Sequence, residues 1–384
     1  MERINIQPNL LHWALERCGK SEDAIKNKFP NISDWLCGKP YPTLKQLEKF
    51  ATATYTPLGY FFLNEPPEDK LPIPDFRTIK GQPERPSPNL LDTIQTMQSR
   101  GEWFREFLLE EGQKPLSFIK SVTLKTEPVN VAIEMRKVLS LSDGWANRVG
   151  TWTEALRLLR RAIEDVGIMI VINGVVGNNT YRPLDVAEFR GFALVDEYAP
   201  LIFINGRDSV SAQMFTIIHE LSHLWLGYEG VSNFYKLQPV KTNIEEFCDQ
   251  VAAEFLVPSE EFKKVVGENQ RANDDAVFQL IARSFKVSPI VAARRALDMK
   301  YISKERFFEF YDKYAKDSEK DRVSRKKKKR GGHFWNNQIV RVGELFGSAV
   351  VQATLEGRLL YRDAYRLTGL KGKTFDNYVT QLGF

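Results

Sequence analysis

Residues 216–227 read Thr-Ile-Ile-His-Glu-Leu-Ser-His-Leu-Trp-Leu-Gly, and the rest of the chain is interpreted from this stretch. Its apolar residues recur at helical spacing, and residues four apart on a helix share a face. His219 and His223 can therefore direct two imidazoles toward one metal ion. Glu220 follows His219 directly and can hold and deprotonate a water molecule on that ion. The stretch thus predicts a metal site with a general base.

The chain contains only four histidines, of which His12 and His333 lie outside this stretch. With so few, a chance His-Glu-x-x-His pattern is expected on the order of a few times in a thousand such sequences. The competing interpretation is a core helix whose two histidines merely satisfy their hydrogen bonds. We expect Asp208 to be the N-cap of this helix and Gly227 to end it.

A catalytic zinc site needs three protein ligands and one open position. Residues 243–258 show helical periodicity followed by a proline, and they place Glu245 and Asp249 on one face. We expect Glu245 to be the third ligand. Asp249 would accept a hydrogen bond from a ligand histidine and so fix its tautomer.

Three other side chains of this helix compete for the ligand role. Glu246 and Glu254 carry carboxylates, although every acid of the helix could instead belong to a solvated face. Cys248 is a further candidate, but buried packing is commoner for a single cysteine. Zn²⁺ is the expected ion, and Mn²⁺ or Fe²⁺ could also occupy a site of two histidines and one carboxylate.

Four segments together resemble the ImmA/IrrE metallopeptidases over about residues 150–300. They are Phe-Arg-Gly-Phe-Ala-Leu at 189–194, Ala-Pro-Leu-Ile-Phe-Ile-Asn at 199–205, the His-Glu-x-x-His helix, and Val-Ala-Ala-Glu-Phe-Leu-Val-Pro at 251–258. The resemblance implies a zincin-like fold and a peptidase that cuts repressor proteins. Asp249 stands where many relatives carry asparagine, a change that keeps a hydrogen-bond acceptor.

Two functions from different classes follow. The first is a zinc-dependent endopeptidase in which His219, His223 and Glu245 hold Zn²⁺, while Glu220 accepts the proton of the metal-activated water and passes it to the leaving amine. By resemblance, its substrate is a repressor or antitoxin-like protein. The alternative is a DNA-binding transcriptional regulator or antitoxin whose metal site is structural or silent.

At 384 residues the chain is long enough for two or three domains and a sizeable core. Its three cysteines, Cys18, Cys37 and Cys248, are odd in number and far apart, which favours a reducing compartment. No apolar stretch is long enough to cross a bilayer, and the N-terminus lacks the basic-then-apolar pattern of a signal peptide. We expect a cytoplasmic protein without a membrane partner.

The net charge of +5 comes from one segment, because residues 316–330 alone carry +6 and the remaining residues sum to −1. The protein is therefore not a uniformly cationic nucleic-acid binder. We interpret residues 316–333 as a basic linker, disordered or loosely helical. Its run Arg325–Arg330 either contacts nucleic-acid phosphates or forms a solvated hinge.

Residues 1–65 are similar to XRE-type helix-turn-helix domains, whose third helix enters the major groove. In this chain that helix begins near Asn31 and offers Ser33 and Asp34, which are poor in positive charge. Lys39 and Lys45, with Lys26 and Lys28, could contact phosphates. DNA binding and protein binding are equally compatible with the pattern. The helices expected here are Asn9–Cys18, Ser21–Lys28, Ile32–Leu36, Thr43–Tyr55 and Leu58–Phe62.

The fold class expected is α+β and mainly helical. The N-terminal bundle is followed by residues 66–150, an extended proline-rich segment and helices (Asn89–Gly112, Val129–Leu141) that dock on the peptidase domain. A zincin-like peptidase domain with a small sheet covers residues 151–315, beginning with a helix at Trp152–Val166. Beyond the linker, residues 334–384 form a small helical unit, which is expected to dock or dimerise.

Three apolar stretches read as strands, at residues 168–172, 189–194 and 201–204. Either of the last two could pair with an extended substrate peptide, or both could be ordinary interior strands. Four side chains are candidate donors opposite the metal, and the sequence does not choose among them. They are Tyr181, Arg190, Tyr228 and Tyr235.

The remaining helices are expected at Ala276–Phe285, Ser288–Asp298 and Lys304–Tyr314. The second of these ends a pattern, residues 281–297, that looks like another helix-turn-helix with Arg294 and Arg295 exposed, although a packing element is the commoner interpretation. The C-terminal unit is expected to hold Trp335–Glu356, Leu360–Thr368 and Lys373–Leu382, the last two with helix-turn-helix geometry.

Overall fold

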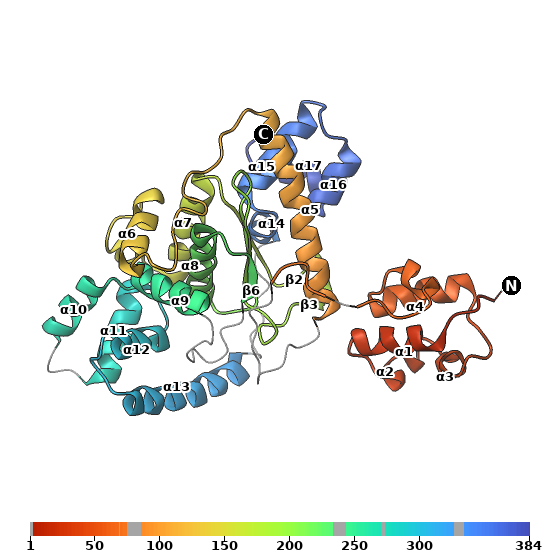
Figure 1. The fold of residues 1–384 in the computed structure, drawn as a ribbon, viewed down its shortest axis with the longest axis horizontal. Coiled ribbons are helices and arrows are strands. Elements are labelled where there is room, and N and C mark those ends of the chain that lie inside the picture. Colours follow the sequence, from red (N-terminus) through yellow and green to blue (C-terminus); the bar gives the residue numbers. More distant parts are fainter. Residues whose placement is uncertain (1–2, 69, 75–85, 233–242, 270–272, 326–333) are drawn as a thin grey trace. The chain divides into compact units, whose positions relative to one another are not determined.

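The computed structural model describes residues 3–68, 70–74, 86–232, 243–269, 273–325 and 334–384. The chain divides into two compact units, and their mutual placement is not determined (Figure 1). Among the described residues, the first unit contains those up to Pro72 and the stretch that ends at Gln95. The second contains Ile73, Pro74 and everything from Thr96 onward.

The first unit is a bundle of short helices, each within two residues of its predicted bounds. Aromatic side chains fill its core, where Phe50 lies edge-on to Phe29, Trp35 and Phe61. A capping box between Thr43 and Gln46 begins the longest helix. The helices are α1 (Pro8–Arg17), α2 (Glu22–Lys26), α3 (Ile32–Leu36), α4 (Leu44–Thr54) and the 3-10 helix η1 (Leu58–Phe62).

The predicted DNA-contacting residues of this unit differ in their surroundings. Asn31, Lys39 and Lys45 are exposed. The Ser33 hydroxyl instead donates a hydrogen bond to the Glu22 carboxylate, so it is engaged within the unit. Their role in DNA binding stays a prediction.

The second unit is mainly helical with a small mixed sheet, as the sequence predicts. No single helix in the described ranges is long and apolar enough to cross a membrane, although the bent pair of helices Asp274–Phe285 and Pro289–Asp298 passes that test of length and composition. Helix α5 (Pro88–Glu110) runs into this unit from the first. The helices that follow are α6 (Pro128–Val138), η2 (Trp145–Arg148), α7 (Trp152–Asp165), α8 (Val210–Leu226), α9 (Asn243–Leu256), α10 (Ser259–Glu268), α11 (Asp274–Phe285), α12 (Pro289–Asp298), α13 (Lys304–Arg325), α14 (Phe334–Val342), α15 (Glu344–Leu355), α16 (Tyr361–Thr368) and α17 (Lys373–Gln381).

The sheet has the strand order β1-β5-β4-β6 and packs against α7 and α8. Strands β1 and β5 are parallel, whereas β4 pairs antiparallel with both β5 and β6. Strands β4 and β5 are therefore interior, so the prediction that one of them is free to pair with a substrate peptide is wrong. The strands are β1 (Met169–Asn173), β4 (Gly191–Leu194), β5 (Leu201–Asn205) and β6 (Gly230–Ser232), with a separate hairpin of β2 (Val175–Val176) and β3 (Asn179–Pro183).

Strand β6 closes the sheet on the side of β4. The Val231 amide donates to the Pro74 carbonyl oxygen, 3.0 Å away. The neighbouring Ile73 side chain is buried. The proline-rich segment expected to be extended therefore reaches the outer edge of β6 at its described end.

Helix α8 is the centre of the second unit and is buried on nearly all sides from Gln213 to Leu226 (Figure 1). Such a helix requires apolar neighbours all round, here the sheet, α7 and α9. Its N-cap is Ser209, whose hydroxyl accepts from the Ala212 amide, and not Asp208 as predicted. Gly227 ends the helix with a φ of 78°, as predicted.

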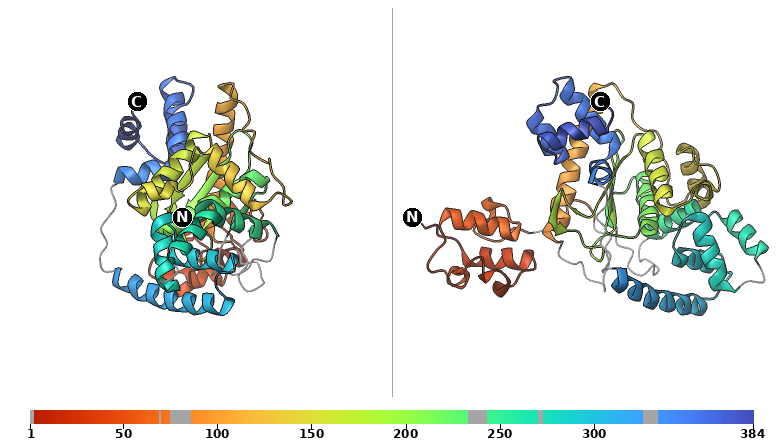
Figure 2. Two further views of the ribbon diagram at one scale, coloured as in Figure 1. Left: turned by 90° about the vertical axis from the view of Figure 1, so that its left-hand side faces the viewer. Right: turned by 180° about the vertical axis from the view of Figure 1, so that it is seen from behind.

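Two further predicted bounds differ from the structure. The expected helix Trp335–Glu356 is two helices, α14 and α15, because Gly343 adopts a φ of 90°, and a Cβ there would lie 3.1 Å from the Ile170 carbonyl oxygen of β1. Helix α13 continues to Arg325, through the first part of the predicted linker, and residues 326–333 lie outside the described residues. Figure 2 shows α15–α17 at the end of this unit opposite α13.

Buried charges hold the C-terminal helices on the rest of the unit. Glu164 of α7 accepts from the backbone amides of Glu344 and Leu345, the first of them at 2.6 Å. It thereby caps the start of α15, a position where the helix dipole favours a carboxylate. Arg100 of α5 is buried and donates to the carbonyl oxygens of Leu367, Arg341 and Val342.

The Glu164 carboxyl gives this docking a pH dependence. Burial raises its pKa to about 7, against the lowering effects of Arg160 and the two amides. Between its unfolded pKa of 4.5 and about 7, the folded protein binds more protons than the unfolded chain, so its stability falls as the pH rises through this window. We expect the stability of the wild type relative to Glu164→Gln to fall by up to about 3 kcal/mol. Denaturant titrations of both proteins at pH 4.5 to 8 measure this difference in the free energy of unfolding. A difference that does not change with pH would contradict the prediction.

Candidate metal centre

Helices α8 and α9 pack together and bring three predicted metal ligands within hydrogen-bond range of one another. The Nε2 atoms of His219 and His223 are 3.1 Å apart. The Glu245 carboxylate places one oxygen 3.3 Å from the first nitrogen and the other 3.1 Å from the second. Both histidines are fully buried and Glu245 is only 2% exposed.

These spacings fit a tetrahedral metal site. Nitrogen or oxygen ligands about 2.0–2.1 Å from a zinc ion, at tetrahedral angles, are separated by about 3.3–3.4 Å. The three separations, 3.1, 3.3 and 3.1 Å, lie within about 0.3 Å of that value, with each histidine facing a different oxygen of Glu245. The donor types, two imidazoles and a carboxylate, are those of catalytic zinc sites. The residues present therefore fit a divalent metal ion.

Asp249 orients the first of the two histidines. Its Oδ1 lies 3.0 Å from Nδ1 of His219, one helical turn beyond Glu245 on α9. When a metal ion is bound, this contact would keep the proton on Nδ1 of His219 and leave the Nε2 lone pair for the metal. Because Glu245 and Asp249 are four residues apart on α9, they contact the two ring nitrogens of the same imidazole, that of His219.

The charges of the site are strongly coupled. Burial disfavours the imidazolium of His219, but Glu245 and Asp249 outweigh this effect and raise its pKa. Burial would raise the pKa of Glu245, but His219 and His223 lower it. Burial lowers the pKa of His223, with the neighbouring imidazole adding to this. In the absence of a metal ion, a proton on His219 therefore balances Glu245, and a divalent cation would replace it.

Glu220 lies against the sheet. Gly191 of β4 is so close to α8 that a Cβ atom there would lie 3.2 Å from Cγ of Glu220 and 2.7 Å from Cγ2 of Thr216. The Glu220 side chain is fully buried. Gly191 lies in the segment Phe-Arg-Gly-Phe-Ala-Leu. Its role in allowing this close approach was not predicted, because only the packing of β4 against α8 shows it.

Cys248 contributes a fourth donor near the histidines. Its Sγ and one ring nitrogen of each histidine lie within 4.8 Å of one another. Burial raises the pKa of this thiol well above its ordinary value, and the carboxylates of Glu245, Asp249 and Glu220 act in the same direction. The thiolate is the form that binds metals, so a metal ion would have to displace the proton of Cys248, and Glu245 remains the expected third ligand.

The structure does not bring the other candidate ligands to the histidines. Glu246 is exposed and accepts from Gln250 on its own helix. Glu254 is buried in an ion pair with Arg295 and accepts a hydrogen bond of 2.6 Å from the Ser259 hydroxyl. Arg295, predicted to be exposed, is only 8% exposed, because its guanidinium closes this buried cluster.

The candidate donors opposite the metal are spread over the domain. The Arg190 guanidinium pairs with Asp208, at 3.5 Å, before the start of α8. His219 lies nine residues further along that helix, about 13 Å along its axis, so the Arg190 ion pair is at the other end of α8 from the metal ligands. Tyr181 is 88% exposed on β3, and Tyr235 lies outside the described residues. Tyr228, half-exposed just beyond Gly227, therefore lies nearest in sequence to the metal-binding end of α8.

Residues 163–297 match the family model Peptidase_M78, the IrrE N-terminal-like domain. This range contains the histidines, both helices of the site and strand β4. The match indicates a metallopeptidase-like domain and supports a relationship to the ImmA/IrrE family for this part of the chain. Residues 342–381 match a domain of unknown function, DUF8813. No curated protein matches the chain.

The contact between β4 and α8 predicts the effect of a methyl group at Gly191. In Gly191→Ala the new Cβ would lie 2.7 Å from Thr216 Cγ2 and 3.0 Å from the Phe203 carbonyl oxygen. Overpacking of this kind should destabilise the protein by about 1–3 kcal/mol in denaturant titrations. Gly267→Ala, where no atom lies within 4 Å of the added carbon, should be neutral or stabilising by up to about 1 kcal/mol. Equal stability of Gly191→Ala and the wild type would contradict this packing.

The donor geometry predicts which substitutions release the metal. Glu245→Ala removes one of three ligands and should weaken Zn²⁺ binding by more than about 100-fold, since loss of a mere hydrogen-bonding partner costs about 10–100-fold. Cys248→Ala should change the affinity by less than about tenfold. Competition titrations with a chromophoric chelator measure both, and the reverse order of effects would make the thiol the third ligand.

Proposed function

We propose that the protein is a zinc-dependent endopeptidase. The observation that carries this is the triad of His219, His223 and Glu245, spaced as ligands of one ion, while Glu220, the residue after His219, is buried against the sheet. The Peptidase_M78 match supports peptide-bond hydrolysis as the reaction. Zinc is favoured over Mn²⁺ or Fe²⁺ because two imidazoles and a carboxylate, with the His-Glu-x-x-His pattern on one helix, are the donor set of catalytic zinc sites.

The side chains divide the chemistry among them. A metal ion held by the triad supplies Lewis-acid polarisation of water and of the peptide carbonyl. Glu220 takes the proton from the attacking water and returns it to the leaving amine. Asp249 holds His219 in the tautomer that presents Nε2. The Glu220 side chain keeps its place because α8 and Gly191 of β4 enclose it.

The substrate proposed is a protein, a repressor or antitoxin-like partner, as the resemblance to ImmA/IrrE peptidases implies. Cleavage would then release the genes that this partner silences. The N-terminal unit, through Asn31, Lys39 and Lys45, and the basic segment 316–330 are the parts proposed to reach DNA. A regulator with a silent metal site is the weaker proposal, because it gives no reason to bury Glu220 beside the ligands.

The test of the general base is Glu220→Gln. Because the amide keeps the shape of the side chain but cannot accept the proton, the variant should bind Zn²⁺ as the wild type does and cut peptides at least about 100-fold more slowly. The assay is the appearance of new termini, detected by mass spectrometry, in a library of random decapeptides. Glu268→Gln, an exposed change of the same kind on α10, is the matched control and should cut normally.

Two results would reject the proposal. One is a metal-loaded wild type that produces no new termini in the library or in candidate repressor proteins. The other is cleavage by Glu220→Gln at the wild-type rate, which would leave the water without its base in this scheme.

A further inference from the structure

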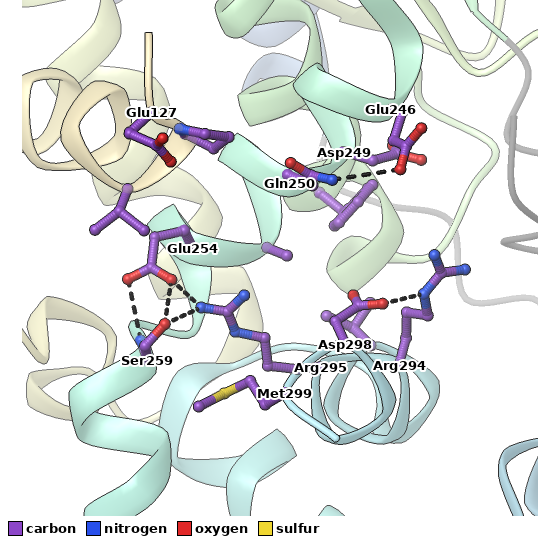
Figure 3. Close-up of a pocket in the computed structure, with 15 residues that line it drawn as sticks. Glu127, Glu246, Asp249, Gln250, Glu254, Ser259, Arg294, Arg295, Asp298 and Met299 are labelled. Atoms are coloured by element: carbon purple, nitrogen blue, oxygen red, sulfur yellow. Dashed lines mark hydrogen bonds and ion pairs between the residues drawn. The ribbon is translucent and has the colours of Figure 1, made fainter. Parts of the chain in front are cut away.

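A cavity of about 450 Å³ lies beside the metal centre, between the start of α6 and the helices α9 and α12. Figure 3 shows the polar side chains around it. Cavities that bind ligands commonly enclose about 300–1,000 Å³. This one is large enough for a long side chain and part of the peptide that carries it. Its apolar wall is formed by Val129, Phe215, Ala253, Val291 and Met299.

The cavity has an excess of negative charge. Five carboxylates line it against two guanidiniums, which gives the lining a net charge of −3. Exposed acids lie at the mouth, among them Glu127 at the start of α6 and Glu246 on α9. The cation that this lining favours must come from a ligand. The five acids are Glu127, Glu246, Asp249, Glu254 and Asp298.

Both guanidiniums are already engaged by acids of the lining. Arg295 pairs with the buried Glu254 and also donates to the Val257 carbonyl, 3.0 Å away. Arg294 pairs with Asp298 at 2.9 Å. These two pairs balance within the wall, as Figure 3 shows, so they offer little attraction to an anion. Asp249 is engaged by His219, so the uncompensated charge of the lining belongs to Glu127 and Glu246.

The cavity reaches a residue that contacts the metal centre. Asp249 lines it and, through Oδ1, holds Nδ1 of His219 at 3.0 Å. Phe215, one helical turn before His219 on α8, forms part of the apolar wall. An occupant of the cavity therefore lies one side chain away from a metal ligand. This proximity makes it a place where a bound peptide can be recognised.

We propose that this cavity binds a lysine or arginine side chain of the protein substrate. The aliphatic stem would pack against the apolar wall, and the cationic end would lie toward Glu127 and Glu246. The inference rests on the proposed endopeptidase activity, because it treats the occupant as part of the substrate. It adds a substrate class to that activity, namely proteins with a basic residue near the cut.

The test measures binding without cleavage. The metal-loaded full chain carrying Glu220→Gln is titrated calorimetrically with acetyl-Ala-Arg-Ala-amide and with the matched norleucine peptide, which keeps a stem but lacks the charge. The arginine peptide should bind at least about tenfold more tightly, a difference that corresponds to two or more ion pairs. Equal affinity for the two peptides would overturn the proposal.

Variants locate the binding to the cavity. The double variant Glu127→Gln, Glu246→Gln should bind the arginine peptide about tenfold more weakly. The control Glu260→Gln changes an exposed residue of α10 outside the cavity lining and should leave the affinity unchanged. An undiminished affinity in the double variant would place the basic side chain elsewhere. Agmatine, a small guanidinium compound that is not part of a peptide, tests whether the cavity binds a free cation instead. If it binds more tightly than the peptide, the ligand is a small free cation and the substrate assignment is wrong.

The wild type then separates this inference from the proposed function. Among decapeptides of the random library, those cut should be enriched at least about fivefold in lysine or arginine at one fixed position. Cleavage without such enrichment would reject the proposed binding of a basic side chain but would still support the proposed endopeptidase activity. Tight binding of the arginine peptide without any cleavage by the wild type overturns the endopeptidase.

Discussion

The packing of α8 against α9 is the contact on which the rest of the domain depends. It brings two imidazoles and the Glu245 carboxylate to an interior point with almost no exposure to solvent. Buried polar groups cost free energy unless charge and hydrogen bonds compensate them. With Glu220 and Asp249 close by, the carboxylates outnumber the single proton that the histidine pair holds. A divalent cation is the compensating charge that this arrangement requires.

The surrounding elements keep α8 in that position. Ser209 and Gly227 fix its ends, and the loop before α6 satisfies its last carbonyls, since Lys120 donates to Leu224 and Val122 donates to Trp225. Strand β4 approaches the other side of the helix closely enough to require glycine at position 191. The helix is thus fixed at both ends and along its length, as a site whose ligand atoms must be placed within fractions of an ångström demands.

Local patterns predicted the parts of the site that lie within one helix. The spacing of His219 and His223, and that of Glu245 and Asp249, follows from 3.6 residues per turn. The spacing did not predict which acid of α9 faces the histidines of α8. Glu246 and Glu254 have the same chemistry as Glu245, and only tertiary contacts exclude them as the third ligand. Arg295 shows the same limit: its burial depends on Glu254, which lies forty-one residues earlier.

The errors have the same origin. Strand β6 has three residues, too few for an alternating pattern, and its pairing makes β4 interior. Ser209 and Asp208 are both good N-caps, so local propensity does not choose between them. Gly343 breaks a helix that its apolar periodicity would continue, because β1 lies against it. The cavity is formed by side chains of α6, α8, α9 and α12, and no single stretch of sequence indicates it.

Zinc-edge X-ray absorption of the metal-loaded wild type tests the central claim most directly, since it counts and identifies the atoms around the ion. The account predicts a single shell of nitrogen and oxygen atoms at about 2.0–2.1 Å, with two imidazoles among them. A sulfur neighbour at about 2.3 Å, or a protein that binds no zinc in stoichiometric amount, would contradict it.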